Sequence, residues 1–172
     1  MASTLNAQSR ILDASQIRQK ITRIAFEIYE HNFEEAELVL VGVAPNGYVL
    51  AELLQQELQK ISPITLHLHR LKLNKTVPTK ESLSLTPELQ NLQNKVVILV
   101  DDVLNTGRTL AYSLPLFLNA QASKIEIATL INRHHTLFPV AATYTGYSLA
   151  TTLNEHIEVS FPEDGNFGAY LS

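Results

Sequence analysis

A run of four apolar residues that ends in two carboxylates constrains the fold of this chain more than any other segment. Residues 97–100 are followed by Asp101 and Asp102, and then by a loop of small and hydroxylated residues at 105–109. An apolar run of this length is typical of a strand buried on both faces of a parallel sheet. Ligands bind at the carboxyl edge of such sheets, and the two acids would lie at that edge.

The loop at 105–109 predicts an anion site at the start of the next helix. The first amide N–H groups of a helix have no partner within the helix, and they bind anions. Gly107 lets the backbone approach a ligand closely, and the hydroxyls of Thr106 and Thr109 add donors. Two carboxylates beside this loop match a phosphorylated ribose. A doubly wound domain with a paired-acid metal site is the alternative, but it leaves the loop unexplained.

These residues resemble the phosphoribosyl-pyrophosphate (PRPP) signature of type I phosphoribosyltransferases. The resemblance implies that Asp101 and Asp102 hold the ribose hydroxyls during catalysis. It also implies Mg²⁺ as the cofactor, carried near the two acids by PRPP and with no direct protein ligand. The residues that it assigns to the 5′-phosphate of PRPP are Asn105, Thr106, Gly107, Arg108 and Thr109.

Length and composition predict one domain that spans residues 1–172. A chain of this length can bury one sizeable core but is too short to fold readily into two. The chain has no cysteine, which excludes disulfides, thiolate catalysis and cysteine metal sites. No apolar run approaches the roughly 18–20 residues that span a bilayer. Because the N-terminus also lacks a charged-then-apolar signal segment, we expect a cytoplasmic protein without membrane contact.

Helix and strand patterns alternate along the chain. One helix is predicted to begin at a Ser15 cap, and its apolar spacing continues to Ile28. Pro115 is expected to kink the helix after the 105–109 loop or to restart it one turn later. The alternation predicts an α/β fold with a central, mostly parallel sheet and helices on both faces. The predicted strands lie at 38–43, 64–69, 97–100, 124–131, 142–147 and 156–161, with an exposed connection at 74–94.

Further segments resemble one branch of this superfamily, the pyrimidine-operon attenuators and uracil phosphoribosyltransferases (the PyrR family). Residues 21–25 and 40–43 match that branch. Residues 132–140, Asn-Arg-His-His-Thr-Leu-Phe-Pro-Val, resemble its Asp-Arg-Gly-His-Arg-Glu-Leu-Pro-Ile hood, which covers the base. The resemblance implies a type I phosphoribosyltransferase fold with a small hood, a dimer or tetramer, and uracil as the base. It assigns base binding to Val103, Arg133 and His135.

The part of the sequence that would handle pyrophosphate departs from this family. The family has Lys-Thr-Arg-Gly where this chain has Ala44-Pro45-Asn46-Gly47, so that an asparagine replaces an arginine that would contact the leaving group. The loss of one such donor can cost about 2.7–4 kcal/mol in the transition state. We therefore expect an intact PRPP site with weakened turnover. The resemblance still assigns PRPP contacts to Pro45, Asn46, Gly47 and Arg70, although Leu71 and Lys72 replace the two acids that follow the family's arginine.

The charge distribution argues against RNA as a partner. Residues 134–172 contain no Lys or Arg, and RNA binding needs several cations. The segment from Leu68 to Lys80 carries four cations and no acid, and this charge suits the binding of a small polyphosphate instead. The cations are Arg70, Lys72, Lys75 and Lys80. Three functions stay open: a PRPP-dependent uracil phosphoribosyltransferase, a non-catalytic sensor of PRPP or a nucleotide, and an RNA-binding attenuator. The intact signature favours the first, and RNA binding is the least favoured.

Overall fold

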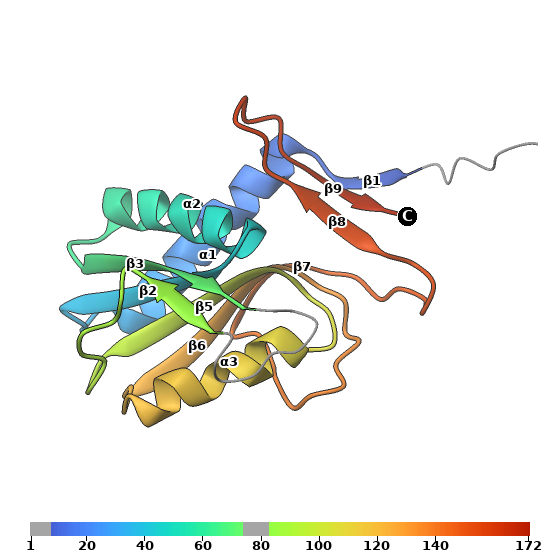
Figure 1. Ribbon diagram of the computed structural model, residues 1–172. Coiled ribbons are helices and arrows are strands. Elements are labelled where there is room, and N and C mark those ends of the chain that lie inside the picture. The colour runs from blue at the N-terminus through green and yellow to red at the C-terminus, as the bar shows by residue number, and fades with distance from the viewer. Residues whose placement is uncertain (1–7, 74–82) are drawn as a thin grey trace, which may run out of the picture.

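A six-stranded sheet forms the centre of the computed structural model, which describes residues 8–73 and 83–172 (Figure 1). The strand order is β4-β3-β2-β5-β6-β7, and each neighbouring pair is parallel except β3 with β4. The predicted α/β fold with a mostly parallel sheet is confirmed. The strands are β2 (Glu37–Val43), β3 (Thr65–Lys72), β4 (Ser84–Thr86), β5 (Val96–Leu104), β6 (Lys124–Asn132) and β7 (Tyr144–Ser148).

The central strand β5 carries the two acids. It pairs with β2 on one side and β6 on the other, and residues 96–100 are buried. The strand continues beyond the predicted end at Val100, so that Asp101 still pairs with Thr129 of β6. The acids therefore belong to the strand itself, at the point where it leaves the core.

Helices cover both faces of the main sheet, as predicted. α1 (Ala14–Asn32) and α2 (Asn46–Ile61) pack on one face, and α3 (Arg108–Asn119) packs on the other (Figure 1). In the part of the chain that the structure describes, no helix is long and apolar enough to span a bilayer. The predicted apolar face of α1 is buried, and it consists of Ile17, Ile21, Ile24, Ala25 and Ile28.

The start of α1 differs from the prediction, and α3 lacks the restart that was one of the two outcomes expected at Pro115. The cap of α1 is Asp13 and not Ser15: its carboxylate accepts the N–H of Gln16 at 2.8 Å, and the Gln16 side chain accepts the N–H of Asp13 at 2.9 Å. This reciprocal pair satisfies two N–H groups at once, which a serine at position 15 does not do. α3 also continues through Pro115 without a restart. Proline removes one helix bond, and the burial of Phe117 beyond it holds the helix on the sheet.

Both ends of the described chain meet in a second, smaller sheet. β1 (Ser9–Leu12), β9 (Gly168–Leu171) and β8 (Ile157–Ser160) pair antiparallel in the order β1-β9-β8 (Figure 1). This sheet lies beside the carboxyl edge of the main sheet, and we call it the small hood. The hood was expected at residues 132–140, but that segment packs against the 105–109 loop instead. The sequence indicated β8 but missed β1 and β9, because four-residue strands that pair across the whole chain leave little local signal.

The expected exposed connection at 74–94 is partly wrong. Residues 74–82 lie outside the described residues. The remainder contains β4, which pairs with β3, and a buried leucine, Leu92. A three-residue edge strand is too short for its alternation to be recognised in the sequence.

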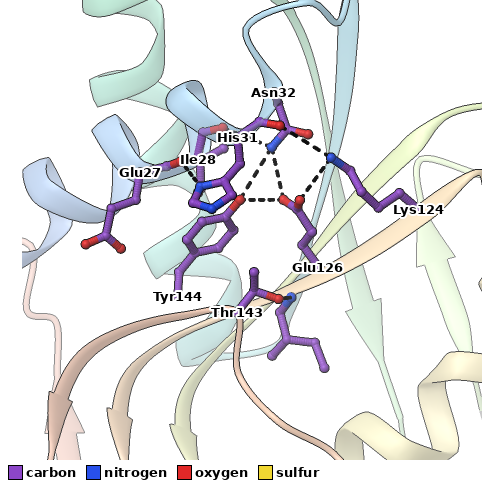
Figure 2. A network of polar contacts seen from close by, with 9 residues as sticks. Glu27, Ile28, His31, Asn32, Lys124, Glu126, Thr143 and Tyr144 are labelled. Atoms are coloured by element: carbon purple, nitrogen blue, oxygen red, sulfur yellow. Dashed lines mark hydrogen bonds and ion pairs between the residues drawn. The ribbon is translucent and has the colours of Figure 1, made fainter.

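A buried polar network fastens α1 to the edge of the sheet that is remote from the acids. Figure 2 shows Glu126 of β6 between Tyr144 of β7 and Asn32 of α1. The Tyr144 hydroxyl donates to the Glu126 carboxylate at 2.6 Å, the Asn32 amide donates at 3.0 Å, and Lys124 forms an ion pair at 3.0 Å. Burial, and then the bond to Glu126, raise the pKa of Tyr144, so that its hydroxyl stays a donor. These contacts compensate for the burial of a carboxylate.

Tyr144→Phe is expected to lower the free energy of unfolding by about 1–3 kcal/mol, because a buried carboxylate oxygen loses its closest donor. Tyr147→Phe, on the same strand, is the matched control, since that hydroxyl is not part of the network; we expect a change within about 0.5 kcal/mol. Urea unfolding of wild type and of the two variants measures both changes in the free energy of unfolding. Equal losses in the two variants would contradict the importance of this network.

Candidate functional site

A pocket of about 580 Å³ lies at the carboxyl edge of the main sheet, under the small hood. It is lined by the end of β5, the loop before α3, the residues after β6, and β8. Segments that are far apart in the sequence therefore meet in one cavity. The predicted site residues that line it are Asn46, Asp101, Asp102, Val103, Asn105, Thr106, Gly107, Arg108, Thr109, Arg133 and His135.

Asp101, the first of the two acids, is in contact with the backbone around it. Asp101 is 8% exposed, and its carboxylate accepts the N–H of Asp102 at 3.0 Å. Gly47 lies against this acid without lining the pocket: a Cβ at Gly47 would lie 2.6 Å from the Val100 carbonyl oxygen and 3.0 Å from the Asp101 Cα. A glycine at this position lets the first turn of α2 approach the end of β5. Its role in the structure is therefore steric.

The 105–109 loop forms a sharp turn into α3. Gly107 has a φ of 80°, in the left-handed region that favours glycine, and α3 begins at the next residue. The first α-helical bond in α3 runs from the Ala111 N–H to the Gly107 carbonyl at 2.9 Å. The amides of Thr109 and Leu110 precede that bond, and both residues line the pocket. This is the arrangement that binds anions at helix N-termini.

The segment at 132–140 packs against this loop from the outside. The N–H groups of Leu137 and Phe138 both donate to the Thr106 carbonyl, at 2.8 and 3.1 Å. The Val140 side chain lies 3.3 Å from the position that a Cβ on Gly107 would occupy. These contacts hold the loop in place, and of this segment only Arg133 and His135 line the pocket.

Asn46 links three parts of the molecule. Its side-chain amide donates to the Asp102 carboxylate at 3.1 Å and to the Val159 carbonyl at 2.8 Å. The first bond reaches β5 and the second reaches β8 in the hood, while Asn46 itself is the first residue of α2. Both N–H groups of the amide are therefore used within the protein.

The structure does not bring Arg70 or Pro45 into the pocket. Both line a separate hollow of about 480 Å³, together with Lys72. The Arg70 guanidinium lies over the ring of Tyr48, 4.2 Å from its centroid, which is a cation–π contact. Burial, and then the charge of Glu52, raise the pKa of Tyr48. Lys75 and Lys80 lie outside the described residues.

The hood contributes pocket residues that the sequence did not reveal. His156 and Glu158 line the same cavity as the acids. The strand at 156–161 was predicted from its alternation, but nothing in the sequence placed it over the end of β5. The sequence indicated a hood at 132–140 and offered no signal for His156 or Glu158.

Comparison with known proteins agrees with this geometry. The phosphoribosyl transferase domain family matches residues 7–165. The bifunctional protein PyrR of Fusobacterium nucleatum is 35% identical over 160 residues, 89% of this chain and 90% of that protein. The pyrimidine operon regulatory protein of Lactococcus lactis strain IL1403 is 34% identical over 163 residues, 93% of this chain and 94% of that protein.

Solved structures agree on the fold. The hypoxanthine phosphoribosyltransferase of Trypanosoma cruzi superimposes with a TM-score of 0.77 at 14% identity and covers 96% of both chains. A hypoxanthine-guanine phosphoribosyltransferase from Bacillus anthracis gives 0.67 at 19% identity over 83% of each chain. The fold and the domain match define an enzyme of the type I phosphoribosyltransferase class. Within it, the chain belongs to the phosphoribosyltransferase family in its PyrR branch.

Asn46→Asp is expected to destabilise the protein in a pH-dependent way. The introduced carboxylate would face two acceptors, the Asp102 oxygen and the Val159 carbonyl, so its pKa should be raised in the folded state. A raised folded pKa contributes stability below the unfolded pKa, and that contribution is lost as the pH rises through the folded pKa. Urea unfolding should therefore show a loss of about 1–3 kcal/mol near pH 7 and a smaller loss near pH 4.

Asn91→Asp is the matched control for this experiment. Asn91 is exposed, and its side-chain oxygen accepts the N–H of Gln93 at 2.9 Å, which a carboxylate oxygen would also do. We expect a change within about 0.5 kcal/mol at either pH. A loss at position 46 that does not depend on pH would show that Asn46 does not face these acceptors in solution.

Proposed function

We propose that the protein transfers the phosphoribosyl group of PRPP to uracil, forming UMP and pyrophosphate. In this reaction N1 of uracil bonds to C1 of the ribose while the C1–oxygen bond to pyrophosphate breaks, and the N1 proton passes to solvent. The observation that carries the proposal is the meeting of two carboxylates and a helix N-terminal loop in one pocket. The names of the PyrR relatives support a pyrimidine as the acceptor.

The acids and the loop have separate tasks in this proposal. The amides of the 105–109 loop and the hydroxyls of Thr106 and Thr109 bind the 5′-phosphate. Asp101 and Asp102 hold the ribose hydroxyls, and their charge stabilises the positive charge that develops on the sugar. Val103 and His135 line the pocket and are proposed to contact the base.

Mg²⁺ is the proposed cofactor, bound through the diphosphate of PRPP. Two neighbouring carboxylates at the pocket fit a hydrated divalent cation, because Mg²⁺ keeps several waters and accepts oxygen ligands. Among the described residues, no cluster of three or more metal-ligating side chains is found. When bound, the metal neutralises charge on the departing diphosphate.

Asn46 is the reason to expect slow turnover. An amide offers no positive charge to the departing pyrophosphate, and here its two N–H groups are already bonded to Asp102 and Val159. Arg70 and Pro45, also expected at the PRPP diphosphate, line the neighbouring hollow instead. The phosphate loop does not include these residues, and we expect it to bind PRPP through its 5′-phosphate.

The wild-type protein is expected to form UMP from uracil and PRPP in the presence of Mg²⁺. Asp102→Asn should reduce kcat by about 10²-fold or more, because the pocket loses a charge that stabilises the transition state. Asp164→Asn is the control, because Asp164 does not line the pocket. Its carboxylate oxygen accepts the Asn166 N–H, and the amide oxygen of an asparagine can accept the same bond. If wild type binds PRPP but never turns over, the protein is a sensor and the proposal is wrong.

A second candidate function comes from the relatives' names, which include a pyrimidine operon regulatory protein. An RNA-binding regulator needs a cationic surface, and residues 134–172 carry no Lys or Arg. Ala141, Tyr147 and Phe26 also stand where the resembled family has basic residues or a histidine. The charge pattern therefore favours the enzyme over the regulator.

RNA binding is expected to be weak and independent of sequence. A gel shift with structured leader RNA at physiological salt, with and without UMP, measures it. A scrambled RNA of equal length is the control, and both RNAs should need micromolar or higher protein, as in non-specific binding at about 10⁻⁴–10⁻⁶ M. Selective binding of the leader RNA at nanomolar protein would establish the regulator.

A further inference from the structure

Arg133 is a buried cation at the wall of the pocket. It follows β6 and is 8% exposed. Its Nε donates to the Thr151 hydroxyl at 2.8 Å, and its Nη1 donates to the Asn105 side-chain oxygen at 2.7 Å. Its Nη2 donates to the carbonyls of Thr152 and Glu155, at 3.2 and 2.8 Å. Four of the five N–H groups of the guanidinium are therefore bonded to the protein.

These acceptors belong to two separate loops. Asn105 opens the loop that precedes α3, whereas the other three acceptors lie in the turn that leads into β8. That turn is itself fixed, because the Glu155 carboxylate accepts the Thr152 N–H at 2.6 Å. This backbone bond is the main cause of the lowered pKa of Glu155. Arg133 thus joins a rigid turn under the hood to the first residue of the anion loop.

The four hydrogen-bond acceptors of Arg133 are all neutral oxygens. Its charge also contributes to the lowered pKa of Glu155, so the Glu155 carboxylate compensates part of that charge. Burial of a cation is costly, and a bound anion nearby offsets part of that cost. The 105–109 loop, bonded to Arg133 through Asn105, offers a place for such an anion.

We infer that Arg133 is a positioning residue for the 5′-phosphate of the ligand. It holds Asn105 so that the loop keeps the shape that an anion needs, and it supplies positive potential to the same place. The base-binding role that the resemblance implied has only one N–H group of the guanidinium left for it, because the other four are bonded to the protein. This inference rests on the proposed function, in which the 105–109 loop binds the phosphate.

Ribose 5-phosphate separates the two roles, because it has the phosphate and the sugar but no base. Calorimetric titration of the full chain gives its Kd for wild type, Arg133→Met, Arg133→Lys and Thr151→Val. Arg133→Met, which removes the charge and the bonds, should weaken binding by about tenfold or more. Arg133→Lys keeps the charge, so it should weaken the binding of ribose 5-phosphate less than Arg133→Met does. A residue that only contacts the base would leave all these Kd values unchanged.

Thr151→Val tests positioning without touching the pocket. Thr151 does not line the cavity, yet it accepts the Nε bond that orients the guanidinium. We expect about threefold to tenfold weaker binding of ribose 5-phosphate, with a thermal unfolding curve that stays cooperative. If Arg133→Met does not fold, this variant decides: a wild-type Kd for Thr151→Val overturns the inference. A wild-type Kd for a folded Arg133→Met overturns it as well.

Thr106→Ala distinguishes failure of this inference from failure of the proposed function. If wild type does not bind ribose 5-phosphate, or if Thr106→Ala binds it as wild type does, the phosphate site is elsewhere and both proposals fall. If Thr106→Ala binds weakly while the Arg133 and Thr151 variants bind normally, the phosphate site stands and only the inference about Arg133 is wrong. Weaker binding in all of these variants supports both.

Discussion

The burial of β5 between β2 and β6 is the constraint on which the rest of the structure depends. Residues 96–100 are apolar and inaccessible to water, so this strand can lie only at the centre of a sheet covered on both faces. Because the neighbouring strands are parallel, their carboxyl ends gather at one edge, and the chain becomes polar there at Asp101. The same strand is thus part of the core and places the two acids in the lining of the pocket.

Above that edge, single polar side chains join the pocket wall to the hood. Asn46 connects Asp102 to the Val159 carbonyl, and Arg133 connects Asn105 to the turn before β8. An arginine at position 46 could form a charge-assisted, bidentate pair with a carboxylate, whereas the amide leaves the negative charge of Asp102 available for the ligand.

Much of the framework could be predicted because its causes are local. The apolar run before Asp101, the turn at Gly107 and the helical spacing from Ile17 to Ile28 each lie within one element, and the structure confirms them. Periodicity and turn chemistry act over a few residues, so they can be recognised in a sequence. At the start of α1, both Asp13 and Ser15 are residue types that cap helices. The reciprocal hydrogen bonds between Asp13 and Gln16 make Asp13 the cap.

The sequence alone determined the class of fold, the central strand and the chemistry of its polar end. Only the tertiary structure decided which distant side chains share the pocket: it brought Glu158 to the pocket lining, turned Arg70 toward Tyr48, and surrounded Arg133 with protein acceptors. The physical reason is that these placements depend on pairing between β1, β8 and β9 and on loops that meet across the fold. Such contacts join residues far apart in the chain, and no local pattern encodes them.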